Sequence, residues 1–171
     1  MKYLPYLFLS ITLQAKLLLS PYEAMTLHFP EDVNIEKKSI LLTKNEAQAV
    51  SKLAKSKLKT KIYKTFHATK DGKLIALGIL VLHKVRSKDT AVLSIITPDG
   101  VLQTVEIIAF NEPIEYLPSK SWLQVLNNKT LSPTLALGKD IPSISAATMS
   151  ARATTMSSRI ALSIFEVKFK K

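Results

Sequence analysis

The sequence predicts a single domain of the α+β class, in which an antiparallel β-sheet packs against a few helices. Its 171 residues suit one domain, and a chain of this size can bury about 70% of the surface that it exposes when unfolded. A hydrophobic content of 47% with 22% charged residues argues against disorder. Segments with helical periodicity are followed by several β-prone segments joined by a tight turn, which favours antiparallel pairing.

The first 24 residues predict a secretory signal peptide. Lys2 is followed by an uncharged apolar stretch at 3–13, and a second apolar run occupies 17–19. The first stretch is shorter than the roughly 20 residues of a typical spanning helix. Two alternatives remain open for this segment, namely a buried first strand and an uncleaved membrane anchor.

Cleavage is expected after Ala15 or Ala24. With the later of these two sites, the chain divides into a signal peptide at 1–24 and a domain at 25–171. A signal peptide implies export. We therefore expect the protein in the periplasm or at the outer face of the cytoplasmic membrane, where it would be membrane-associated.

The first helix is expected at 44–56. Thr43 and Glu46 have the spacing of a capping box, and apolar residues then recur at helical intervals. Lysines alternate with other residues between Leu58 and Tyr63, which predicts an edge strand with one solvated face. These lysines are interpreted either as solvated charge or as a docking surface.

Three further strands are expected beyond position 73, and the last two flank a Pro-Asp-Gly turn that makes them a hairpin. They are Leu74–Arg86, Ala91–Thr97 and Val101–Phe110. An irregular stretch at 111–119 follows, and then come a helix at 121–127 and a final helix at 151–165.

The net charge of +11 is unevenly distributed. Residues 52–88 hold eleven Lys or Arg and one Asp, whereas residues 89–116 hold five acidic and no basic side chains. Only three of the 24 cations are arginines, although base recognition depends on the bidentate guanidinium. We therefore expect no nucleic acid partner, and the charge division suits steering toward an oppositely charged redox partner.

Several chemistries are excluded or disfavoured by composition. The chain has no cysteine, which excludes disulfides, thiolate metal sites and a cysteine nucleophile. The histidines at 28, 67 and 83 lack metal-ligand spacing, and no glycine-rich phosphate loop occurs. The sequence therefore predicts no metal site and no catalytic residue.

The segment 141–153 places small and hydroxylated residues directly before the last helix. Small residues allow a ligand to approach the backbone, and the amides and dipole of a helix N-terminus favour a phosphate. Thr148 and Ser150 are equally well interpreted as ordinary helix caps.

The hexapeptide 145–150, Ser-Ala-Ala-Thr-Met-Ser, resembles the Ser/Thr-Gly-Ala-Thr-x-Ser/Thr motif of the FMN-binding domain family. That family includes flavin-carrying subunits of the sodium-pumping NADH:quinone reductase and of Rnf complexes, together with small exported flavoproteins. Ala146 stands at the family's glycine, and Pro142 stands where the family usually has an acidic residue. The resemblance spans about residues 30 to 165, and further matching segments follow in the family's order: 83–86, 98–100, 110–119, Trp122 and 128–129.

The resemblance implies that FMN is joined through its phosphate to Thr148 as a phosphoester, and that a separate magnesium-dependent flavin transferase makes this bond. The residues that would enclose the phosphate are Ser145, Ala146, Ala147, Met149 and Ser150. The residues that would lie near the cofactor are His83, Arg86, Glu112, Tyr116 and Trp122. Other interpretations stay open, since Trp122 also suits a core anchor and the His83–Arg86 strand end also suits a solvated position.

The expected function is an exported electron-transfer flavoprotein that passes electrons between a membrane or soluble donor and an acceptor. Because a flavin supplies the redox chemistry, we expect such a protein to be a carrier or a component of a membrane electron-transfer complex rather than a stand-alone enzyme. One alternative is a flavin-free basic interaction module that docks on an anionic membrane or an acidic protein. Another is a small-molecule reductase that uses bound flavin.

Overall fold

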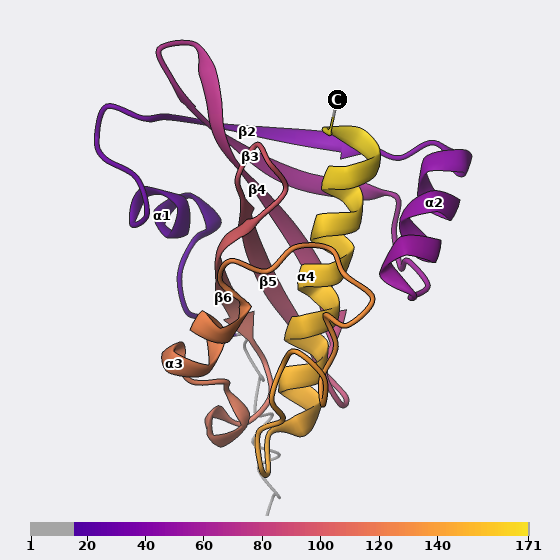
Figure 1. Ribbon diagram of the computed structural model, residues 1–171. Coiled ribbons are helices and arrows are strands. Elements are labelled where there is room, and N and C mark those ends of the chain that lie inside the picture. The colour runs from indigo at the N-terminus through magenta and orange to yellow at the C-terminus, as the bar shows by residue number, and fades with distance from the viewer. Residues whose placement is uncertain (1–15, 171) are drawn as a thin grey trace, which may run out of the picture.

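The computed structural model describes residues 16–170 and has the α+β fold that the sequence predicts. Five antiparallel strands follow one another as a meander (Figure 1). A two-residue strand, β1, extends the sheet beside β6. The strands are β1 (Lys16–Leu17), β2 (Asn34–Leu41), β3 (Ile62–Lys70), β4 (Lys73–Lys84), β5 (Asp89–Ile96) and β6 (Leu102–Phe110).

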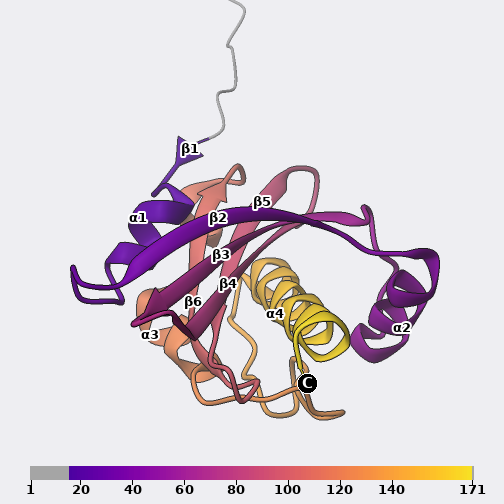
Figure 2. The same ribbon diagram turned by 90° about the horizontal axis from the view of Figure 1, so that it is seen from above.

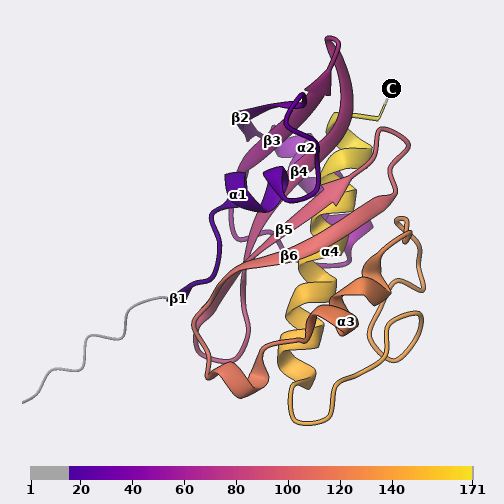
Figure 3. The ribbon, with the colours of Figure 1, turned by 90° about the vertical axis from the view of Figure 1, so that its left-hand side faces the viewer.

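Helices cover both faces of this sheet. α4 runs along one face with α2 beside it, and α1 lies on the opposite face (Figure 2). The helices are α1 (Pro21–Thr26), α2 (Lys44–Ala54), α3 (Lys120–Leu123) and α4 (Thr148–Lys168), with 3-10 turns η1 (Ile114–Tyr116) and η2 (Gln124–Leu126). The connection from η2 to α4 lies alongside α4 (Figure 3).

The alternation of side chains along β4 divides the core into two clusters. Leu77 and Ile79 belong to the cluster under α4, whereas Ala76 belongs to the cluster under α1, as the two-residue period of a strand requires. Met25 of α1 packs against Gly78, where an added Cβ atom would lie 2.7 Å from its sulfur. The glycine therefore lets α1 approach the sheet closely.

The predicted signal peptide falls partly outside the described residues, which begin at Lys16. Within the described part, the Leu18 amide donates a hydrogen bond of 2.9 Å to the carbonyl of Ile108. Ala24 and Met25 are both fully buried. The segment 16–24 is thus packed against the sheet in this structure.

The capping box at the start of α2 is confirmed. The Thr43 hydroxyl accepts a hydrogen bond from the Glu46 amide at 3.2 Å, and the Thr43 amide donates to the Glu46 carboxylate at 2.8 Å. The expected edge strand at 58–63 is wrong, because these residues mostly form the α2–β3 connection and the edge strand is β2. β2 has six exposed residues among its eight, so its sequence carries too weak an apolar pattern to predict it.

The strands expected at Leu74–Arg86, Ala91–Thr97 and Val101–Phe110 are confirmed as β4, β5 and β6, with ends shifted by one or two residues. Gly100 closes the predicted hairpin turn with a φ of +82°, which favours glycine. The last helix begins earlier and ends later than the expected 151–165. Its face toward the sheet contains many Ser and Thr residues, so apolar spacing underestimates its length.

Candidate functional site

The hexapeptide 145–150 forms the turn that leads into α4 and the first turn of that helix. Two hydrogen bonds fold the turn back on Ile144. The Ala147 amide donates to the Ile144 carbonyl at 3.2 Å, and the Thr148 hydroxyl donates to the same oxygen at 2.9 Å. The half-buried Thr148 side chain is thereby held at the lip of the helix.

Ala146 adopts a left-handed backbone conformation with a φ of +65°. A residue with a Cβ atom pays roughly 1–2 kcal/mol for this conformation, whereas glycine adopts it readily. The turn therefore has the backbone shape of a glycine turn although alanine occupies the position.

The N-terminus of α4 lacks a capping side chain. Its N-cap residue is Ala147, which offers no side-chain acceptor, and the amides of a first helical turn have no partner within the helix. The Ser150 side chain, in the same turn, is 2% exposed, and its hydroxyl has no hydrogen-bond partner among the described residues. Unpaired donors and the positive end of a 21-residue helix thus gather at one place.

A hollow of about 350 Å³ lies at this helix end, and we call it the α4 hollow. Three separate parts of the chain line it: the β4–β5 turn, the segment after β6 and the start of α4. The lining residues are Val85, Arg86, Glu112, Tyr116, Ala146, Ala147, Thr148, Met149 and Ser150. The structure therefore brings together eight of the eleven residues that the resemblance implied.

Arg86 is the one Lys or Arg among the lining residues of the α4 hollow. Its guanidinium carbon lies 5.7 Å from the centre of the Tyr116 ring, within the range of a cation–π contact. The Glu112 carboxylate accepts hydrogen bonds from the amides of the β4–β5 turn. Desolvation opposes ionisation of Glu112, but these hydrogen bonds outweigh it and hold the pKa of Glu112 below its usual value.

Three predicted residues do not line the α4 hollow. Ser145 is exposed in the turn just before it. His83 lies near the end of β4, where burial and Lys59 lower its pKa while Asp89 opposes them. Trp122 is buried in the main core, and its indole N–H donates a hydrogen bond of 2.9 Å to the Pro142 carbonyl, which ties α3 to the segment that enters the site.

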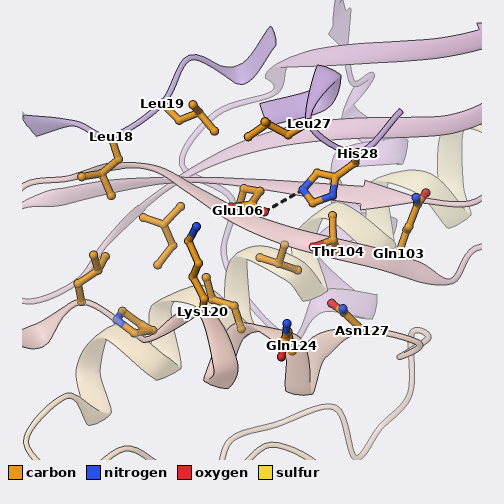
Figure 4. Close-up of a pocket in the computed structure, with 15 residues that line it drawn as sticks. Leu18, Leu19, Leu27, His28, Gln103, Thr104, Glu106, Lys120, Gln124 and Asn127 are labelled. Carbon is orange, nitrogen blue, oxygen red and sulfur yellow. Dashed lines mark hydrogen bonds and ion pairs between the residues drawn. The ribbon is translucent and has the colours of Figure 1, made fainter. Parts of the chain in front are cut away.

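The structure also contains a larger groove that the sequence does not predict. It has a volume of about 680 Å³ and lies between the segment around α1, strand β6 and the α3–η2 region. Figure 4 shows His28 and Glu106 facing each other within it, and their side chains are 2.8 Å apart. Because 78 positions separate the two residues, no local pattern relates them.

Two kinds of feature are absent from residues 16–170. No three His, Asp or Glu side chains in this range gather closely enough to hold a metal ion. No helix in the same range is both long and apolar enough to cross a membrane.

Neither a protein-family model, nor a curated protein, nor a solved structure matches this chain. The resemblance to the FMN-binding domain family accordingly stays a prediction that rests on the motif residues. What the structure adds is the geometry around Thr148.

Proposed function

We propose that this protein is an exported electron-transfer flavoprotein whose FMN is attached through its phosphate to Thr148. It passes electrons between a membrane or soluble donor and an acceptor, as a carrier or as part of a membrane electron-transfer complex. Its partners are a flavin transferase, needed for maturation, and a redox protein.

One observation carries the proposal, namely the convergence of unpaired donors and positive charge at the start of α4. Thr148, Met149 and Ser150 of the first turn line the α4 hollow together with Arg86 and Glu112. The Glu112 carboxylate is already bound by the β4–β5 turn, whereas the Ser150 hydroxyl has no partner among the described residues. A buried hydroxyl without a partner costs free energy, and a phosphate oxygen would give it an acceptor. The donor set therefore fits the phosphate group of FMN, which becomes a diester once it is joined to Thr148.

The roles of the residues follow from this fit. Thr148 Oγ1 is the atom that would carry the phosphoester, and before attachment its hydrogen bond to the Ile144 carbonyl holds the side chain at the helix lip. On attachment the hydroxyl would give up its proton, and with it this hydrogen bond, while the group joined to the phosphorus in the transferase's flavin donor would leave. The first-turn amides and Arg86 would balance the phosphate charge. When bound, FMN supplies reversible electron transfer, while the protein orients it and sets its surroundings.

The test is the mass of the intact protein after co-expression with a flavin transferase of proven activity. We expect a flavin mass increment that survives denaturation, that is retained in Thr148→Ser and that is lost in Thr148→Val. The serine variant keeps the hydroxyl and the valine variant keeps the shape, so the pair isolates the attachment atom. A wild-type chain of unmodified mass would contradict the proposal.

A second candidate function has its own supporting observation. Leu41 and Ile62 lie opposite each other on β2 and β3, and they are 64% and 61% exposed. They border a shallow depression with four lysines and no carboxylate, and we call this the basic-apolar surface. Its lysines are Lys44, Lys57, Lys59 and Lys61. Exposed aliphatic side chains surrounded by lysines suit an anionic membrane surface, so the alternative is a flavin-free module that docks there.

Vesicle binding of the full chain tests this alternative. We expect binding to phosphatidylcholine vesicles to increase at least about tenfold when phosphatidylglycerol replaces about a third of the lipid, since each lysine near the surface contributes roughly 1 kcal/mol. The triple variant Lys44→Glu, Lys57→Glu, Lys61→Glu should abolish this increase. The matched control replaces Lys73, Lys129 and Lys139 by Glu, since these lysines lie outside the basic-apolar surface. This control should retain most of the increase in binding. Equal binding to both vesicle types would reject docking on an anionic membrane. If the basic-apolar surface selectively captured an acidic protein instead, that protein and not the membrane would be the docking partner.

A further inference from the structure

The Glu112 carboxylate is bound by the turn between β4 and β5. Its Oε1 atom accepts hydrogen bonds from the amides of Arg86 at 3.1 Å, Ser87 at 2.9 Å and Lys88 at 3.0 Å. A hydrogen bond of 2.9 Å from the Val85 amide to the Lys88 carbonyl closes the same turn. Successive amides that point to one centre form an anion-binding concavity, and in this protein a carboxylate of the chain itself fills it.

The same segment also holds the Arg86 side chain. The Arg86 backbone is bonded to Glu112, and its guanidinium lies over the ring of Tyr116, which follows Glu112 by four positions. The backbone and the charged end of Arg86 are thus both fixed by the residues after β6. Without the carboxylate, three amides of the turn would lose their acceptor and the position of Arg86 would no longer be defined.

We propose that Glu112 is a positioning residue, which fixes the β4–β5 turn so that Arg86 is presented to an anion at the start of α4. The role of Arg86 toward a cofactor phosphate rests on the proposed function. Glu112 acts on the anion indirectly, through the hydrogen bonds that Oε1 accepts from three amides of the turn and not through a contact of its charge with the anion. It therefore has no need to contact the flavin.

The distinction between hydrogen bonding and charge is testable in the full chain with four variants. Glu112→Gln keeps an oxygen at the same place and removes the charge, whereas Glu112→Ala removes both. In co-expression with the transferase, flavin loading should fall at least about tenfold in Arg86→Met and in Glu112→Ala, as expected for loss of a charge-assisted contact, and should stay near wild type in Glu112→Gln. The double variant Glu112→Ala, Arg86→Met should load no less than Arg86→Met alone, because Glu112 acts through Arg86.

Two results would overturn the assignment. Loading as low in Glu112→Gln as in Glu112→Ala would show that the negative charge itself is used. Losses that multiply in the double variant would show that Glu112 and Arg86 act independently.

Inorganic phosphate separates a failure of this inference from a failure of the proposed function. Phosphate titrated into the unloaded protein should shift the amide signals of Thr148, Met149 and Ser150 in nuclear magnetic resonance spectra. Its affinity should fall by the same factor in Glu112→Ala and Arg86→Met, and should be retained in Glu112→Gln. This pattern would support the positioning role even if no flavin were attached. Phosphate binding that is unchanged in Glu112→Ala would reject it even if the flavin were present.

Discussion

Arg159 of α4 donates a hydrogen bond of 2.9 Å to the carbonyl of Leu53, in the last turn of α2 and 106 positions earlier in the chain. The same guanidinium group donates to the carbonyls of Ala54, Ser132 and Leu135. The Arg159 side chain is only 4% exposed. Since the C-terminal carbonyls of a helix attract cations, this arginine joins α2, α4 and the η2–α4 connection at one point.

Replacement of Arg159 by methionine is expected to lower the free energy of unfolding by about 3 kcal/mol or more, because four backbone carbonyls lose a buried donor. Urea denaturation followed by circular dichroism measures the change. Arg152→Met is the matched control, since Arg152 is an exposed arginine on the same helix, and its effect should stay within about 0.5 kcal/mol. Equal effects of the two substitutions would contradict the role of Arg159 as an anchor.

The left-handed conformation of Ala146 predicts opposite effects for two substitutions. Ala146→Gly should raise the free energy of unfolding by about 1 kcal/mol, because glycine removes the strain of a positive φ. Ala146→Val should lower it, since a β-branched residue is disfavoured further in this region. Thermal unfolding of the two variants beside the wild type checks both signs, and a destabilised glycine variant would show that the turn is not strained.

The unpaired hydroxyl of Ser150 predicts that one substitution raises the stability of the protein and lowers its flavin loading. In the protein without flavin, Ser150→Ala should raise the free energy of unfolding by about 1 kcal/mol, because a buried polar group without a partner is removed. Flavin loading of the same variant should fall. Ser158→Ala is the control, since the Ser158 hydroxyl is buried but bonded to the Thr154 carbonyl at 3.1 Å, and this variant should gain no stability.

Glu112 predicts a pH dependence of stability. A carboxyl group whose pKa is lower in the folded state stabilises the protein above its ordinary value of 4.5, and this contribution is lost as the pH falls through the folded value. The free energy of unfolding of the wild type should therefore exceed that of Glu112→Gln at neutral pH, by at most about 1 kcal/mol because solvent screens a carboxylate near the surface. The gap should shrink as the pH falls below 4.5. Denaturation at a series of pH values measures this difference. A difference that stays constant would show that the pKa of Glu112 is not lowered in the folded state.

The packing of residues 16–24 predicts where an export signal is cut. Cleavage after Ala15 leaves β1 and α1 complete, whereas cleavage after Ala24 removes β1 and four of the six residues of α1. We therefore expect the mass of the exported protein to correspond to a chain that begins at Lys16. As a check on the reason, a chain that begins at Met25 should melt about 5–10 °C below one that begins at Lys16. Equal melting temperatures would remove the preference.

The elements that the sequence predicts correctly are those marked by residues a few positions apart in the chain. The capping box of Thr43 and Glu46 and the hairpin turn at Gly100 are set by residues a few positions apart, and both were predicted from the sequence. The sequence does not predict β2, because most of its side chains are exposed. The predicted start of α4 is three residues later than the observed start, because no capping residue marks it.

The candidate site was only partly predictable for a similar reason. The motif pointed to Thr148 and its neighbours, and the order of matching segments pointed to Arg86, Glu112 and Tyr116. The contact that organises them, from Glu112 to the β4–β5 turn, joins residues 24 to 26 positions apart. Such a pairing depends on the register of β5 and β6, which hydrophobic periodicity alone does not fix.

The order of the strands determines when the site is completed during folding. From β2 to β6 each strand pairs with the next one along the chain, so the sheet can grow by successive hairpins with little loop-closure entropy. α4 is the last element of the described chain, and its first turn together with the turn before it supplies five of the nine residues that line the α4 hollow. We therefore expect the hollow to assemble only after the sheet has formed, so that the proposed attachment residue Thr148 reaches its final surroundings in the last step of folding.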